Sequence, residues 1–550
     1  MTTTTVLLLT PEIVLIVAAA TIYLGGTFSM ARSVWRWVAG AAVLLAAALL
    51  WAQHGPAESG GSINLDALAW FGRWLALGFG GLFVMLTSRP LEETGEATSR
   101  ELPQLSFDEN GTVPLHRCGA GGTPEYVGSL LLTIAGLMLV AGAGELVLLF
   151  VGLELISIPT YVMLYLGRRD AACRESAAKY FFLSVLASAI LLYGFSFLYG
   201  TTGATELADV RAALDGTKTL PTGFDTMAKL AMALIFAGLC FKVAAVPFHF
   251  YAPDVYQGNT HPNAALLSVV PKTAGLLAMA RVLVIAMPGM EPYSWRIVLA
   301  TSILTMTFGN VMALWQDDLR RLLAYSSIAQ AGYMLLSLAV GMASCGAPHS
   351  WDGIAALWFY LATYAVATIG AFAVWEHLGR ASRSLDAVDE LAGLGRTRPM
   401  AAAVLAVCLF SLAGIPPLAG FWGKLFVFGS ALNVGETMPP NVAEHLRPWF
   451  IGAAIVGVLN AVVAAAYYLR VVAVMYFRTP LATPRARGGT GAWCTAVACA
   501  LLVIGLGVYP GPLVRESNCA SARGTGPFFG EQADLIGQRP VHRENRDSSL

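Results

Sequence analysis

The sequence predicts an all-α integral membrane protein. Of its 550 residues, 56% are hydrophobic and only 12% are charged, whereas about a quarter of the residues in soluble domains are charged. Long apolar runs recur along the chain without the alternation that is typical of membrane strands. The 34 basic and 34 acidic side chains balance, so the charge gives no support to a nucleic-acid partner.

The apolar runs predict about fourteen transmembrane helices, because a hydrocarbon core of about 30 Å takes roughly 20 residues of helix. No basic residue precedes the first run, so we expect a membrane span there and not a removed signal peptide. The spans are expected near residues 11–30, 34–52, 66–87, 127–143, 145–166, 178–199, 229–250, 262–287, 296–315, 321–341, 353–376, 400–433, 449–477 and 492–509.

Two segments are too polar for a membrane. Residues 91–124 are expected to form a flexible cytoplasmic loop, and residues 512–550 a disordered tail. The loops between spans alternate in basic content: those that contain Arg168 and Arg320 are rich in arginine, whereas the loop with Arg296 is poor. The positive-inside rule then predicts that both termini lie outside the cytoplasm.

The sequence contains no motif for a redox or nucleotide cofactor. Its eight cysteines are scattered without a C-x-x-C pair, and no glycine-rich loop stands where a strand-to-helix turn would use it. We therefore expect this chain to hold no cofactor and no metal. Any electron transfer would take place in other chains.

Four ionisable residues inside predicted spans are the main candidates for function: Glu154, Lys242, Lys272 and Lys424. An isolated charge at the centre of a bilayer costs about 3 kcal/mol or more, so each one needs a partner, water or a function. Burial disfavours the charged form of a lysine, whereas a nearby carboxylate stabilises it. A Glu–Lys pair that opens and closes would therefore load and release a proton. Static ion pairs that only hold helices together are the alternative.

Prolines interrupt two of the spans close to these lysines. Lys242 lies five residues before Pro247, and Lys424 follows the Pro416–Pro417 pair. Prolines inside a span free backbone carbonyls and break the helix, and broken helices at membrane depth mark ion sites in transporters. His249, just after the first break, is a secondary candidate that would either bridge Lys242 to Lys272 through water or be structural.

Other charged residues are predicted to lie at the interface. Arg73 and Arg281 fall inside spans, and we expect their guanidinium groups to reach toward the membrane surface. A further interfacial cluster is expected at a predicted helix start and comprises Asp317, Asp318, Arg320 and Arg321.

Six stretches follow one another along the chain: LLFVGLELISIPTYVML, ESAAKYFFLSVLASAILLYG, FKVAAVPFHFYAPDVYQG, LLSVVPKTAG, DDLRRLLAYSSIAQAGYMLLSL and FSLAGIPPLAGFWGKLFVF. In sequence and order they resemble the subunit N family of bacterial NADH–quinone oxidoreductase, respiratory complex I. The resemblance covers most of the chain between Glu125 and about Pro510. It departs at Gln330, where the family often has a histidine that titrates.

The resemblance implies a fold with two inverted five-helix repeats, each containing a broken helix. It also implies that Glu154 and Lys242 form the charge pair of one half-channel, that Lys272 links the halves, and that Lys424 serves the other half. The implied organisation is three helices in residues 1–90, the loop 91–124, the first antiporter-like repeat 125–290, the second repeat 291–480, the last helix 481–511 and the tail 512–550.

The function that the resemblance implies is proton translocation in NADH–quinone oxidoreductase, coupled to quinone reduction elsewhere in that complex. Flavin and iron–sulfur clusters would lie in partner subunits, and the chain would be a multi-pass protein of the bacterial inner membrane. Related complex I subunits either carry Glu at the Lys424 position or extend beyond the fourteenth span with a long lateral helix. Here the residue is Lys424 and no segment after residue 509 is apolar enough for a further span, which favours subunit N. A subunit of a multi-subunit cation/proton antiporter and a purely structural membrane subunit are the alternatives.

Overall fold

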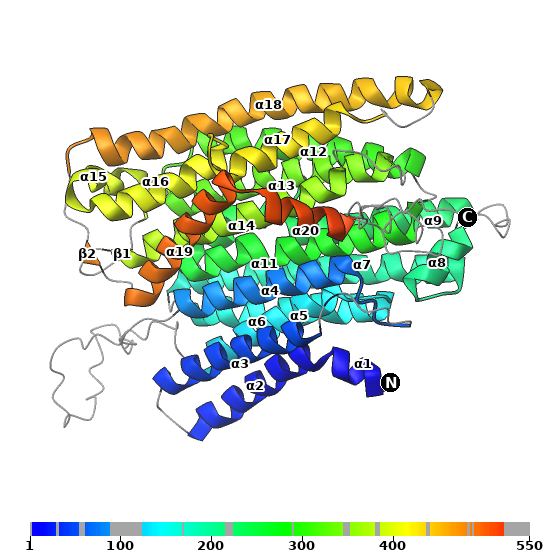
Figure 1. Cartoon of the computed structure of the whole chain (residues 1–550), viewed down its shortest axis with the longest axis horizontal. Helices are drawn as coiled ribbons and strands as arrows, with labels where there is room; N and C mark the ends of the chain where they lie inside the picture. The colour runs from blue at the N-terminus through cyan, green and yellow to red at the C-terminus, as the bar shows by residue number, and fades with distance from the viewer. Residues whose placement is uncertain are drawn as a thin grey trace, which may run out of the picture.

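The computed structural model describes residues 3–28, 32–53, 55, 61–87, 124–167, 170–214, 224–288, 291–344, 352–379, 386–435, 440–480, 485–486 and 489–521. Nearly all of these residues are helical (Figure 1). The helices are α1 (Thr3–Leu8), α2 (Thr10–Phe28), α3 (Arg32–Ala52), α4 (Ala67–Leu86), α5 (Pro124–Ala141), α6 (Leu146–Gly167), α7 (Ala171–Thr202), α8 (Leu207–Leu214), α9 (Phe224–Val243), α10 (Tyr251–Gly258), α11 (His261–Met279), α12 (Glu291–Leu314), α13 (Leu319–Ala343), α14 (Gly353–His377), α15 (Leu394–Thr397), α16 (Pro399–Ala413), α17 (Ala419–Leu432), α18 (Pro440–Phe477), α19 (Gly489–Val508) and α20 (Gly511–Ser521).

Short elements complete the described chain. A π-helical turn over Ala280–Ala286 continues α11, and a 3-10 turn covers Val388–Leu391. The strands β1 (Leu378–Gly379) and β2 (Arg485–Ala486) pair in antiparallel orientation. These two-residue strands are far too short to cross a membrane, so the prediction of an all-α membrane fold is confirmed.

The helices match the fourteen predicted spans. In the described part of the chain, thirteen helices are long and apolar enough to cross a membrane. The shorter apolar helices α16 and α17 together occupy the remaining predicted span, near residues 400–433. Aspartates begin several helices: the side chains of Asp66, Asp170, Asp318 and Asp352 accept backbone N–H groups at the starts of α4, α7, α13 and α14. Such caps satisfy N–H groups that have no partner within the helix.

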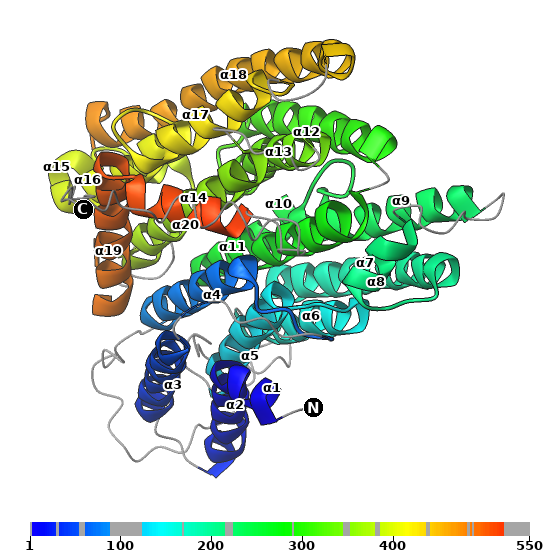
Figure 2. The same ribbon diagram turned by 45° about the vertical axis from the view of Figure 1, so that its right-hand side comes forward.

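The centre of the bundle is formed by α11, α13 and α14, whose apolar segments are buried almost throughout. Helices α2 and α3 lie at one edge and α18 at the opposite edge (Figures 1 and 2), and only about a third or less of the apolar window of each is buried. Exposed apolar side chains on such outer helices are expected where lipid or a neighbouring membrane subunit covers them. The central helices carry Lys272, Gln330, Tyr360 and Tyr364.

The polar segments are only partly described. Residues 511–521 form α20, which packs against α4 and α14, so the expectation of disorder from residue 512 is wrong for this stretch. The helix is short and polar on average, which is why the sequence pattern does not reveal it. The predicted loop 91–124, except Pro124 at the start of α5, and the tail beyond residue 521 lie outside the described residues.

Candidate functional site

Two helix breaks have the same backbone plan. The first follows α9, where Ala244 has φ +60° and a cis peptide joins Val246 to Pro247. The second follows α16, where Gly414 has φ +87° and a cis peptide joins Pro416 to Pro417. In both, a left-handed residue therefore stands three positions before the proline of a cis bond. Both of the breaks that the sequence predicts are present, each with a buried lysine nearby.

The first break carries an ion pair between α6 and α9. Lys242 lies in the last turn of α9, and its Nζ is 3.7 Å from Oε1 of Glu154 on α6. The lysine side chain is 3% exposed and that of the glutamate 22%. Gly238, one turn before Lys242, lets α9 approach α7 closely, because a Cβ there would lie 2.9 Å from the carbonyl oxygen of Ala187. The structure therefore brings together the two charges that the resemblance pairs.

Hydroxyl groups supply the close contacts of this pair. Lys242 Nζ donates to Oγ of Ser157 on α6 at 2.6 Å and to Oγ of Ser184 on α7 at 3.3 Å. Ser188 Oγ, one turn further along α7, donates to Glu154 Oε1 at 2.5 Å. Each charge is thus hydrogen-bonded to serine more closely than to its opposite charge. Sequence reasoning missed these serines, because isolated serines in apolar helices are common and carry no spacing signal.

Lys272 lies at the centre of the bundle, one residue after Pro271 in α11. Its Nζ donates to the carbonyl oxygen and to Oγ of Ser327 on α13. Tyr364 on α14 donates to the same Ser327 Oγ at 2.8 Å, and its ring centroid lies 5.7 Å from Nζ. Among the described residues, no carboxylate forms an ion pair with Lys272. This lysine is therefore surrounded by neutral dipoles.

Lys424 on α17 points back into the second break. Its Nζ donates to the carbonyl oxygens of Leu412 and Ala413, at 3.0 and 2.8 Å, at the end of α16. The break leaves these carbonyls without helical partners, and the negative end of a helix favours a cation. A Cβ on Gly414 would lie 2.8 Å from Lys424 Cδ, so glycine supplies both the left-handed conformation and the space for this side chain.

Gln330 on α13 connects to the same break. Its Nε2 donates to the Leu412 carbonyl at 3.1 Å and to the hydroxyl of Tyr468 on α18 at 3.2 Å. The Tyr360 hydroxyl of α14 donates to Gln330 Oε1. The Leu412 oxygen thus accepts hydrogen bonds from both Gln330 and Lys424. Because Gln330 lies three residues after Ser327 on α13, polar groups follow one face of that helix from the Lys272 contact to the Lys424 contact.

His249 lies in the first break, between α9 and α10. Its ring packs edge-on against Phe308, with centroids 4.5 Å apart. In the part of the chain that the structure describes, no hydrogen bond or ion pair joins His249 to Lys242 or Lys272. The predicted bridge would run through water, so it stays a prediction beside the structural alternative.

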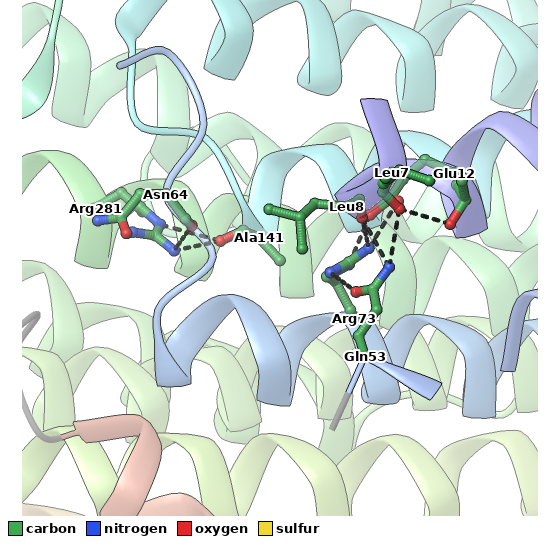
Figure 3. Close-up of polar contacts among 9 residues, drawn as sticks. Leu7, Leu8, Glu12, Gln53, Asn64, Arg73, Ala141 and Arg281 are labelled. Carbon is green, nitrogen blue, oxygen red and sulfur yellow. Dashed lines mark hydrogen bonds and ion pairs between the residues drawn. The ribbon is translucent and has the colours of Figure 1, made fainter. Parts of the chain in front are cut away.

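The prediction that Arg73 and Arg281 reach toward the membrane surface is wrong. The Arg73 side chain is 2% exposed and pairs with Glu12, from Nε to Oε1 at 2.7 Å (Figure 3). Arg281 is 1% exposed and binds both carboxylate oxygens of Asp66, at 2.9 and 2.7 Å, and the Ala141 carbonyl. The acidic partners were visible at the starts of the first and third spans, but sequence spacing does not show which distant helices meet.

Replacement of Arg73 by Met should strongly destabilise the protein. The buried Glu12 would lose its partner, and breaking a buried pair from one side costs about 3–5 kcal/mol. We expect a clear fall of Tm for the purified protein in detergent. Glu12→Gln combined with Arg73→Met should recover most of that loss, whereas Arg174→Met, at an exposed position, should change little. An unchanged Tm for the single Arg73 variant would contradict a stabilising role of the pair.

The predicted charge cluster does stand at a helix start, that of α13. Asp318 caps the helix by accepting the backbone N–H groups of Arg320 and Arg321, and the side chains of the other three members pair with residues elsewhere in the chain. Arg321 Nη1 is 3.0 Å from Asp254 of α10, Arg320 Nη2 is 2.9 Å from Asp386, and Asp317 is 3.6 Å from Arg470 of α18. The cluster therefore ties the two halves of the chain together at one end of the bundle.

Buried lysines beside two broken helices, in a bundle of apolar helices, define an antiporter-like membrane protein. The family described as NADH:quinone oxidoreductase/Mrp antiporter, TM matches residues 143–439. NADH-quinone oxidoreductase subunit N of Rhizorhabdus wittichii is 36% identical over 95% of this chain and 99% of its own length. The subunit N of Granulibacter bethesdensis is 37% identical over 72% of this chain and 78% of its own. The chain belongs to the subunit N family of NADH–quinone oxidoreductases.

Solved structures agree with this assignment. A chain of respiratory complex I from Thermus thermophilus, with bound aureothin, superposes with a TM-score of 0.71 and 29% identity, covering 92% of this chain and 98% of that chain. A chain of the Mrp complex from Dietzia sp. DQ12-45-1b gives a TM-score of 0.72 at 22% identity, over 95% and 97% of the two chains. The second likeness shows the shared fold alone.

Proposed function

We propose that this chain is the subunit N that carries protons across the membrane in a bacterial NADH–quinone oxidoreductase, driven by quinone reduction elsewhere in that complex. The observation that carries the proposal is the set of three buried lysines, two of them at helix breaks. Polar groups of α13 lead from Lys272, which contacts Ser327, to the Leu412 carbonyl that Gln330 and Lys424 share. A charge in a membrane interior costs about 3 kcal/mol or more, so a scaffold would not need three lysines of which two have no carboxylate partner among the described residues.

The proposed path begins at the Glu154–Lys242 pair and passes Lys272 to Lys424. Ser327 and Tyr364 surround Lys272, and the Gln330 amide bonds the same carbonyl oxygen as Lys424. Gln330 does not titrate, so a proton that passes this point needs water or a tyrosine hydroxyl. The two repeats, residues 125–290 and 291–480, would each supply one half of the path, which is in keeping with one helix break and a buried lysine beside it in each repeat.

The rest of the complex follows from the same proposal. NADH oxidation needs flavin and iron–sulfur clusters, which we place in partner subunits. The chain would lie in the bacterial inner membrane with lipid and other membrane subunits around its exposed apolar helices, and both termini would lie outside the cytoplasm. A cation/proton antiporter subunit is the second candidate, supported by the fold shared with the Dietzia Mrp chain. The relatives with 33–40% identity favour the first.

Purification of the tagged chain from its native membrane in mild detergent tests the proposal. We expect flavin and iron–sulfur subunits to accompany it, together with NADH-driven quinone reduction. Recovery with small antiporter-type membrane subunits alone, without redox activity, would contradict the proposal and favour the cation/proton antiporter.

A further inference from the structure

Three serines surround the Glu154–Lys242 pair, and their hydroxyl groups have opposite roles. Ser157 donates its own proton to the Leu153 carbonyl at 2.8 Å, which leaves its oxygen free to accept from Lys242. Ser188 instead donates its proton to Glu154. The hydroxyls beside the lysine therefore act as acceptors, whereas the hydroxyl beside the carboxylate acts as a donor. Each serine is oriented for the charge that it contacts.

The distances describe an ion pair that is partly open. The charged atoms are 3.7 Å apart, whereas the serine contacts are 2.6 Å for the lysine and 2.5 Å for the glutamate. Charge-assisted hydrogen bonds between an ammonium and a carboxylate are normally about 2.7–2.9 Å. The serines thus supply the close hydrogen bonds that the opposite charges would otherwise make with each other.

We infer that Ser157, Ser184 and Ser188 are positioning residues for the Glu154–Lys242 pair. Their hydrogen bonds stabilise the state in which the two charges are separated, so that the pair can form and separate reversibly. This inference rests on the proposed proton-translocating function. When the two charges separate, each one keeps a hydrogen bond to a serine hydroxyl. Neither charge is then buried without a partner, which would cost free energy. Without the serines, the closed ion pair is the best hydrogen-bonded state, and the lysine keeps its proton.

The arrangement is built into the helices. Glu154 and Ser157 are three residues apart on α6, and Ser184 and Ser188 four apart on α7, so each pair shares a helix face. Lys242 enters between these faces from the last turn of α9, just before the break. A small displacement of the α9 end toward α7 would therefore lengthen the Lys242–Glu154 distance, while Lys242 keeps Ser184 and Glu154 keeps Ser188.

The test uses the complete complex in membrane vesicles. Ser157→Ala together with Ser184→Ala should reduce NADH-driven proton pumping by at least roughly tenfold, because both hydrogen bonds to Lys242 are lost and a single hydrogen bond to a charged group is worth about that much. Thr at both positions should restore most of the pumping, because it keeps the hydroxyls. Thr160→Val is the matched control: Thr160 is buried on the same helix α6 and donates only to the Ile156 carbonyl, at 2.7 Å.

The outcomes separate the inference from the proposed function. Pumping at the parental rate in the double Ala variant, or a loss that Thr does not restore, overturns the role of the serines. If the double variant fails to assemble, Ser188→Ala and Ser188→Thr replace it in the test. Reduced pumping with Ala and near-parental pumping with Thr support the inference, whereas equal pumping rates of the two variants overturn it. A parallel Lys242→Ala variant that pumps normally would instead contradict the proposed function itself.

Discussion

Replacement of Lys242 by Ala should abolish proton pumping or reduce it at least about tenfold, while the complex still assembles. The change removes the one cation that pairs with Glu154 in the described structure and leaves Ser157 and Ser184 without their charged donor. Alanine is smaller than lysine and has a high helix propensity, so α9 should keep its last turn. Acidification of vesicles on NADH addition measures pumping, and native gel electrophoresis measures assembly.

The matched control for this variant is Lys179→Ala. Lys179 lies on α7 with a side chain 43% exposed, and it pairs with Glu175 at 2.7 Å at the protein surface. Exposed pairs of this kind contribute about 0–1 kcal/mol, so pumping should stay close to the parental rate. Normal pumping by an assembled Lys242→Ala complex would exclude this lysine from the proton path.

Replacement of Lys424 by Arg should also reduce pumping at least about tenfold, although it keeps the positive charge. Arginine does not lose its proton in proteins, so a group that must both accept and release a proton would be fixed in its charged form. The planar guanidinium would still find the Leu412 and Ala413 carbonyls, which favours assembly. Pumping in vesicles, normalised to the amount of assembled complex, is the measurement.

Lys179→Arg is the control for the Lys424 variant, because it makes the same chemical change at an exposed lysine. A second check is electron transfer in membranes made leaky to protons, where a structural defect in the complex would still slow NADH oxidation. Unimpaired pumping by Lys424→Arg would show that this lysine acts as a fixed charge and does not titrate.

The sequence is informative where a physical requirement acts locally. A span needs about 20 apolar residues, so run lengths alone locate the membrane helices. Prolines mark both breaks, but Pro159 and Pro271 lie in runs that stay helical, so a proline alone does not locate a break. The lysines stand out because few charges occur in such runs. The pairing of Glu154 with Lys242 has a different origin: it depends on how α6 and α9 pack, and the family resemblance, not the residue pattern, supplied it.

The sequence does not predict the contacts between helices that are distant along the chain. Arg73 and Arg281 resemble side chains that extend toward an interface, but they find Glu12 and Asp66 on other helices and are buried. The serines around the ion pair and the tyrosines around Gln330 look like ordinary helix residues until the helices are packed. Residues 511–521 form α20 and pack against α4 and α14. The composition of this segment alone does not predict that packing.

The contacts of α11 have a mechanical consequence. At its start, Asn263 accepts a hydrogen bond from the Tyr126 hydroxyl at 2.7 Å and donates to the Met163 carbonyl at 2.9 Å. At its far end, Arg281 is bound to Asp66, the residue that also caps α4. Because α11 is hydrogen-bonded to other helices at both ends, it resists translation along its axis. The backbone at Lys272 is therefore expected to stay in place. We expect protons to pass this residue by side-chain rotation and rearrangement of water, and we expect larger displacements of the backbone only at the two helix breaks.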